Sequence, residues 1–348
     1  MTRRSRIIVA TLGAVVLAGA VAGAAIVLAG LFNVSARAGH LDFVRPILHM
    51  TYKNSVRLRA PSEDEVPDLQ APGLALLGAR HFELACARCH GLPGMRQDAT
   101  IGAMLPQPPH VTQTMEDWEP RHLHWILQEG VKMSGMPHWP SRRSDDIWAV
   151  VAYLEAVRAD EAPEPAKPAT GLGTCTSCHG ERGQGVAPQI PRLDILSEEY
   201  MKTTLRAYRD GTRESGIMRH VASSMPLSVL DSAARSFAAM RPGPARAGPD
   251  SGLARRGGAI AARGSRDVPA CNACHARGGG TGTDQGQAGP PLAGQSAVYL
   301  ETQLRLWRSG LRDGGARANL MTKAAQDLGD DQIEALAAHF ASQTPERR

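Results

Sequence analysis

The chain has 348 residues, a formal net charge of +5, 36 glycines and 24 prolines, and only 4% of its residues are aromatic. This length suggests two or three domains, and so few aromatic side chains predict a thin apolar core in each of them. No block of basic residues interleaved with aromatic ones occurs beyond the N-terminus, so we expect no nucleic-acid partner.

The N-terminal segment, residues 1–38, has the pattern of a membrane anchor. Three arginines within the first six residues precede an uncharged run from Ile7 to Phe32, which is long enough to cross a bilayer with its basic end in the cytoplasm. A cleaved secretory signal is the alternative, since Ala36-Arg37-Ala38 resembles a cleavage site, although the apolar part of a signal is normally about 7 to 15 residues long. Either interpretation exports the rest of the chain, to the periplasm in a bacterium. We expect a single-pass protein of the inner membrane.

Two stretches rich in proline, residues 160–170 and 241–251, have no apolar periodicity and the composition of semi-stiff linkers. Residues 39–71 form a connector after the anchor. The linkers divide the remainder of the chain into three predicted domains: residues 72–159, 171–240 and 252–348.

All six cysteines belong to CxxCH motifs, one in each predicted domain: Cys86, Cys89 and His90; Cys175, Cys178 and His179; Cys271, Cys274 and His275. A CxxC pair can form a redox disulfide, half of a zinc site or a heme attachment site. Zinc sites of this type usually combine two CxxC pairs within one small fold. Heme attachment needs two thiols to bind the vinyl groups and an adjacent histidine to bind iron. The motifs therefore predict three covalently attached heme c groups.

Each predicted domain ends in an amphipathic helical pattern, with apolar residues at i, i+3, i+4 and i+7 counted from Ile147, Leu230 and Ile333. One methionine precedes these residues by 11, 12 and 12 positions, respectively: Met136, Met218 and Met321. A methionine on the second axial position closes the iron and raises its potential. We predict these three methionines as the second iron ligands, with Met133 and Met225 as the alternatives.

The sequences CARCHG, SGMPHW and CTSCHG, and the block beginning PPLAGQ, resemble class I cytochromes c. Residues 200–211 align without a gap on residues 299–310, so the last two domains resemble each other and the diheme cytochromes c. The first domain is similar to the monoheme cytochromes attached to membrane respiratory complexes, because of Trp139 and the helix start at Asp145. The resemblance covers nearly all of residues 72–342.

This resemblance implies an all-α fold, in which an N-terminal transmembrane helix is followed by three class I cytochrome c domains. It also implies that a proline carbonyl orients each CxxCH histidine, with Pro191, Pro291, and either Pro108 or Pro109 similarly placed. The second domain departs from the pattern, because only residues 170–174 separate its linker from the first cysteine. Its first helix is expected to be missing or very short, so that one face of its heme rests on a neighbouring domain or is open to solvent.

An iron with both histidine and methionine has no open position, so we expect a carrier of single electrons and not an enzyme. The expected donor is a quinol-oxidising complex or a dehydrogenase, and the expected acceptor is a terminal oxidase or a soluble cytochrome. Two alternatives stay open. The protein could be a cytochrome subunit of a membrane-bound dehydrogenase, or a heme enzyme with one open iron, which would be the iron in the second domain that Met218 is predicted to bind.

Overall fold

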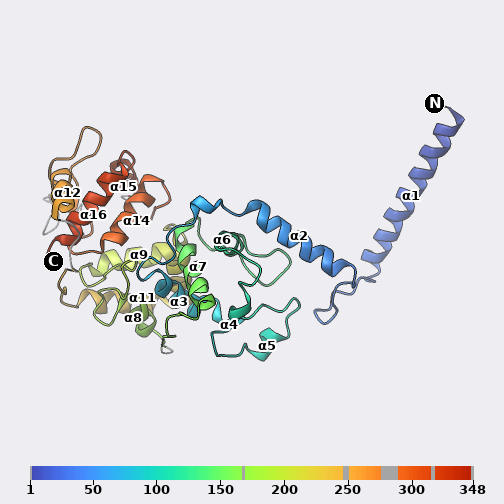
Figure 1. Ribbon diagram of the computed structural model, residues 1–348, viewed down its shortest axis with the longest axis horizontal. Coiled ribbons are helices and arrows are strands. Elements are labelled where there is room, and N and C mark those ends of the chain that lie inside the picture. Colours follow the sequence, from blue (N-terminus) through green and yellow to red (C-terminus); the bar gives the residue numbers. More distant parts are fainter. Residues whose placement is uncertain (1, 167–168, 246–250, 276–288, 315–317, 346–348) are drawn as a thin grey trace.

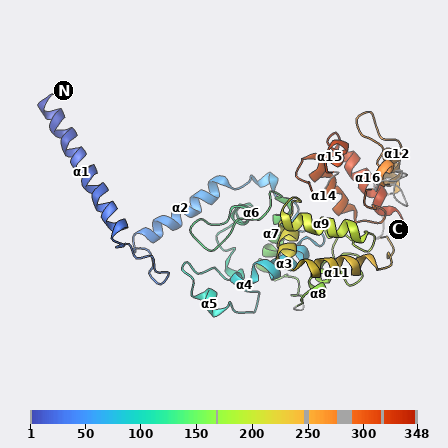
Figure 2. The same cartoon turned by 180° about the vertical axis from the view of Figure 1, so that it is seen from behind.

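The computed structural model describes residues 2–166, 169–245, 251–275, 289–314 and 318–345. Parts of the two expected linkers, residues 167–168 and 246–250, therefore lie outside the described residues. Within the described ranges the fold is helical, with one isolated bridge between Leu92 and Met95. Figure 1 shows a helical body from which α2 and then α1 extend, and Figure 2 shows the same arrangement from behind. The all-α fold is thereby confirmed for the described part of the chain.

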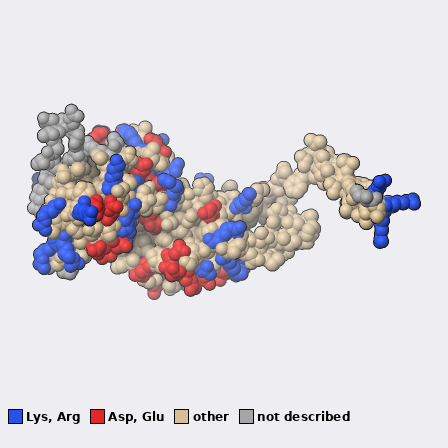
Figure 3. Space-filling model, turned by 90° about the horizontal axis from the view of Figure 1, so that it is seen from above, with Lys and Arg blue, Asp and Glu red and all other residues tan. Residues whose placement is uncertain are grey.

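Helix α1 (Arg3–Leu28) is long and apolar enough to cross a membrane. None of its residues is buried within the protein, and Figure 3 shows basic side chains at its tip and none along the rest of it. It starts and ends about four residues earlier than the uncharged run. A signal sequence passes the same test of length and composition, so the fold leaves both interpretations of the N-terminus standing.

Helix α2 (Val44–Arg59) lies in the expected connector, where no helix was predicted. Val56 is fully buried, the ring of Tyr52 meets that of Trp118 edge-on at 5.4 Å, and Lys53 pairs with Asp117 at 2.7 Å. The C-terminal half of α2 is therefore packed against the body rather than tethered to it. A short 3-10 turn, Glu63–Glu65, follows it.

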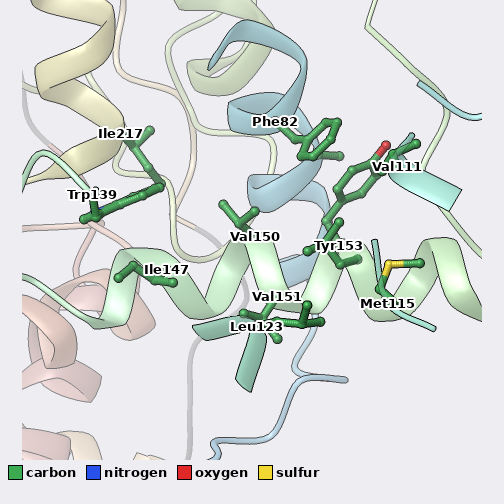
Figure 4. Close-up of a cluster of buried hydrophobic side chains, with 12 residues drawn as sticks. Phe82, Val111, Met115, Leu123, Trp139, Ile147, Val150, Val151, Tyr153 and Ile217 are labelled. Atoms are coloured by element: carbon green, nitrogen blue, oxygen red, sulfur yellow. The ribbon is translucent and has the colours of Figure 1, made fainter. Parts of the chain in front are cut away.

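We call the parts of the chain around the three CxxCH motifs segment 1 (residues 72–159), segment 2 (171–240) and segment 3 (251–345). Segment 1 contains a 3-10 turn (Val111–Gln113) and five α-helices: α3 (Leu74–Ala85), α4 (Ala87–His90), α5 (Ala99–Gly102), α6 (Pro120–Glu129) and α7 (Asp145–Arg158). The predicted stripe on α7 is confirmed, because Ile147, Val150 and Val151 are fully buried in the cluster that Figure 4 draws.

Segment 3 repeats this arrangement. Its described helices are α12 (Ser251–Arg263), α13 (Asn272–His275), α14 (Ala297–Arg308), α15 (Ala318–Ala325) and α16 (Asp330–Ser342). In both segments the first helix crosses the last one at a glycine. A Cβ atom at Gly78 would lie 1.8 Å from the carbonyl oxygen of Ala149, and one at Gly257 would lie 1.8 Å from that of Ala335. Only glycine permits such an approach of two backbones.

Segment 2 consists of α8 (Leu172–His179), α9 (Glu198–Asp210), α10 (Gly216–Ser224) and α11 (Leu227–Ala238). Helix α8 begins three residues before Cys175, so the predicted absence of a preceding helix is confirmed for the described residues. Ser232 on α11, which corresponds to Ala149 and Ala335, is exposed. Among the described residues, segment 2 has no first helix of its own to cross α11, but it contacts segment 1. At this contact the Gln189 side chain donates to the Pro72 carbonyl at 2.9 Å.

Candidate heme sites

Each CxxCH motif forms a helical turn. In the first and third motifs the backbone N–H of the histidine donates to the carbonyl of the first cysteine at 2.9 Å. The second motif lies within the continuous helix α8. The six cysteines form no disulfide. Burial raises the pKa of Cys86 to about 12 and those of Cys175 and Cys271 to about 11. Redox-active cysteines normally have depressed pKa values, so these thiols are poorly suited to disulfide exchange. Within the described ranges no three His, Cys, Asp or Glu side chains converge as a zinc site requires.

The three motif histidines are oriented in the same way. Their Nδ1–H groups donate to proline carbonyls: His90 to Pro109 at 2.8 Å, His179 to Pro191 at 2.9 Å, and His275 to Pro290 at 2.9 Å. This bond fixes the tautomer and leaves Nε2 as the atom that can bind a metal. Burial lowers the pKa values of His90 and His179, which favours the neutral imidazole that a metal needs.

The proline partners confirm one expectation, resolve a second and correct a third. Pro191 is confirmed, and Pro109 rather than Pro108 serves His90. Pro291 was wrong, because the acceptor is its neighbour Pro290. The offset of 99 residues that relates residues 200–211 to residues 299–310 also relates Pro191 to Pro290, so extending the repeat would have identified it.

The expected methionines occupy related positions in segments 2 and 3. Met218 is the third residue of α10, and Met321 is the fourth residue of α15. Both helices follow the repeated helix, α9 or α14, and precede the terminal helix. Met321 packs on the core of segment 3. Met218 and its rival Met225 both pack on the cluster around Tyr208, but Met225 lies past the end of α10 with extended backbone, so Met218 is the positional equivalent of Met321.

In segment 1 the candidate methionine lies in a tight loop. The carbonyl of Met136 accepts from the Val131 N–H at 3.1 Å, and its N–H donates to the Ser134 hydroxyl at 3.1 Å. Met136 is partly buried, whereas its rival Met133 is 92% exposed. A ligand has to point into the protein, so the loop favours Met136 over Met133.

A cationic cluster between segments 2 and 3 was not found from the sequence. Arg213 donates to Tyr200 Oη at 3.4 Å and lies near Tyr299 Oη at 3.5 Å, while Arg312 lies 3.4 Å from Tyr200 Oη. Each guanidinium also stacks on a ring of its own segment, Tyr208 at 4.7 Å and Trp307 at 4.8 Å. The two arginines are 99 residues apart, as are the two rings. The cluster therefore has approximate twofold symmetry.

Among the described residues, the side-chain contacts of these two arginines are with hydroxyls, an amide and aromatic rings, not with carboxylates. Arg213 is only 4% exposed. Burial raises the pKa of Tyr200, but Arg213 and Arg312 outweigh it and bring the value down to about 8. An uncompensated buried charge is costly. The two carboxylates of a heme are the counter-charge that such a site fits, so the residues present suit the cofactor that the motifs predict.

Three CxxCH turns, three histidines whose Nδ1 atoms are each bonded to a proline carbonyl, and a buried cationic cluster define a c-type cytochrome. Residues 73–154 match the family described as cytochrome c oxidase, cbb3-type, subunit III, and residues 170–230 and 261–344 match the cytochrome c family. The chain belongs to the multiheme class I cytochromes c, and as such it carries covalent heme c and transfers electrons.

Particular relatives are similar to this chain over about half of its length. The thiosulfate dehydrogenase electron acceptor of Stutzerimonas stutzeri is 34% identical over 216 residues, which cover 59% of this chain and 94% of that protein. Cytochrome c4 of Pseudomonas aeruginosa is 30% identical over 171 residues, covering 48% and 82%. The crystal structure of reduced cytochrome c4 from Pseudomonas stutzeri is 28% identical and covers 50% of this chain and 96% of its own, with a TM-score of 0.44.

Proposed function

We propose that the protein is a triheme electron carrier, with one class I cytochrome c domain at each CxxCH motif. The observation that carries this proposal is the repeated bond between each motif histidine and a proline carbonyl. Cys86 and Cys89, Cys175 and Cys178, and Cys271 and Cys274 would hold the three groups, whose chemistry when bound is a one-electron couple. Met136, Met218 and Met321 are the proposed second ligands of His90, His179 and His275.

The proposed location is the periplasmic face of the inner membrane. Helix α1 would hold the chain there, with its basic end in the cytoplasm. The match of residues 73–154 to an oxidase subunit supports delivery of electrons from segment 1 to a membrane oxidase. The similarity to thiosulfate dehydrogenase electron acceptors supports a periplasmic sulfur-compound dehydrogenase as the donor.

Two measurements test the number of hemes and whether any iron has an open coordination position. The pyridine hemochrome of the purified protein should give three hemes per chain, and two would contradict the proposal. Carbon monoxide added to the reduced protein should leave the Soret band unchanged, because histidine and methionine close every iron. A change in about one-third of the heme would instead support a heme enzyme with an open site.

The donor is tested separately. A purified thiosulfate dehydrogenase, supplied with thiosulfate, should reduce the oxidised protein faster than the same mixture without thiosulfate does. Reduction no faster than in the mixture without thiosulfate would reject this donor and leave a quinol-oxidising complex. Stable co-purification with a catalytic subunit would support the alternative of a dehydrogenase subunit.

A further inference from the structure

Segments 1 and 2 meet where α7 begins and where α10 begins. Glu214, just before α10, accepts from the Ser141 hydroxyl at 2.8 Å and from the Arg142 backbone N–H at 3.0 Å. The indole of Trp139 lies against the Gly216 backbone, so closely that a Cβ atom added at Gly216 would be 2.1 Å from the Nε1 atom of Trp139. Figure 4 shows Ile217 beside Trp139, within the core of segment 1. The first turn of α10 is thus held by segment 1.

A carboxylate of segment 1 lies at the centre of this contact. Asp146 Oδ2 accepts from the Ser215 hydroxyl at 2.9 Å and from the Gly216 N–H at 2.9 Å, and Oδ1 pairs with Arg143 at 3.0 Å. All four residues are buried. A negative charge at the N-terminus of a helix is stabilised by the helix dipole, and the Gly216 N–H has no partner within the helix.

The same serine hydroxyl reaches a proposed iron ligand. Ser215 is the N-cap of α10, and its Oγ accepts from the backbone N–H of Met218 at 3.2 Å. Because this hydroxyl donates its proton to Asp146, its lone pairs face the helix. The carboxylate therefore fixes the orientation of the cap, and the cap fixes the turn that carries Met218.

We propose that Asp146 of segment 1 is a positioning residue for Met218 of segment 2, acting through Ser215 and the Gly216 N–H. The inference rests on the proposed role of Met218 as an iron ligand. Segment 2 lacks the helix that precedes the motif in segments 1 and 3, and the start of α7 in segment 1 supplies a support from outside segment 2. Methionine ligation of the second heme then depends on the contact between the two segments.

The test uses the full-length protein with its hemes. Asp146→Asn removes the charge, and Ser215→Ala removes the hydroxyl without leaving an unpaired charge. Both should weaken the far-red sulfur-to-iron absorption by up to about one-third and lower one of the three midpoint potentials, because loss of methionine lowers the potential. The other two potentials should stay as in the unmodified protein.

Two matched controls separate positioning from general destabilisation. Asp145→Asn removes a neighbouring carboxylate that pairs with the same arginine, and Ser197→Ala removes the N-cap of α9 in the same segment. Both should leave the far-red band and the potentials unchanged. If Met218→Ala removes one-third of the band while Asp146→Asn and Ser215→Ala leave it intact, the positioning role is wrong. If Met218→Ala itself leaves the band intact, the ligand assignment fails, and the inference fails with it.

Discussion

The side-chain amide of Gln295 pairs with both backbone polar groups of Arg192. Its Oε1 accepts from the Arg192 N–H at 2.9 Å, and its Nε2 donates to the Arg192 carbonyl at 3.1 Å. Arg192 directly follows Pro191, the residue that orients His179. A side chain of segment 3 therefore braces the loop that orients the proposed iron ligand of segment 2.

Gln295→Ala should destabilise the protein strongly. Gln295 and Arg192 are 4% and 3% exposed, and a buried backbone group left without its hydrogen bond costs about 1–3 kcal/mol. With two groups affected, we expect the free energy of unfolding to fall by roughly 2–6 kcal/mol, as measured by urea denaturation followed through the heme bands. Gln326→Ala, at an exposed position, is the control and should change it by less than about 0.5 kcal/mol. Equal effects of the two substitutions would refute the bracing role.

Gly78→Ala should be among the most damaging single substitutions in segment 1. A Cβ atom would lie 1.8 Å from the Ala149 carbonyl oxygen, so α3 and α7 would have to separate. Overpacking of this kind typically costs about 1–3 kcal/mol and can cost more. Thermal denaturation compares it with Gly102→Ala on α5, where the nearest atom is a flexible side chain at 3.9 Å. A melting temperature that Gly78→Ala does not lower would contradict the crossing.

The sequence predicts those features that depend on local pattern. The terminal helices follow from the stripes that begin at Ile147, Leu230 and Ile333, and all three residues are buried. The missing first helix of segment 2 follows from the composition before Cys175. These features were predictable because the periodicity of a helix and the composition of a linker are local properties, which a window of about 15 residues contains.

The contacts between segments could not be predicted in this way. Gln295 and Arg192 are 103 positions apart, and Asp146 and Ser215 are 69 apart, so each pair depends on how whole segments pack. The cluster of Arg213 and Arg312 left a weaker signal, since both arginines follow the repeated helix at the same offset. That repetition identifies equivalent positions, but it does not show that the two guanidiniums meet around one hydroxyl.

Arg213→Gln should lower the midpoint potentials of the hemes in segments 2 and 3. Removing a buried positive charge favours the oxidised iron, which carries one more positive charge than the reduced iron. We expect a fall on the order of 60 mV, which corresponds to a tenfold change in a one-electron equilibrium. Spectroelectrochemical titration measures it, and Arg206→Gln, which removes a partly exposed arginine paired with Asp231, should shift the potentials far less. Potentials that stay constant in Arg213→Gln would argue against an anion at this cluster.

His81 should make the protein sensitive to acid. Burial lowers the pKa of His81 to about 3, with a smaller contribution from His220, and the ring of His81 lies edge-on to Trp139 at 5.0 Å. The unfolded chain binds a proton at this histidine below about pH 6.5, whereas the folded protein binds it only below about pH 3. The contribution of His81 to the free energy of unfolding is therefore full above pH 6.5 and is lost as the pH falls from 6.5 to 3. His81→Phe should flatten the decline of the melting temperature between pH 7 and pH 4. The control His138→Phe, at an exposed position, should retain the decline, and a slope unchanged in His81→Phe would show that other groups cause it.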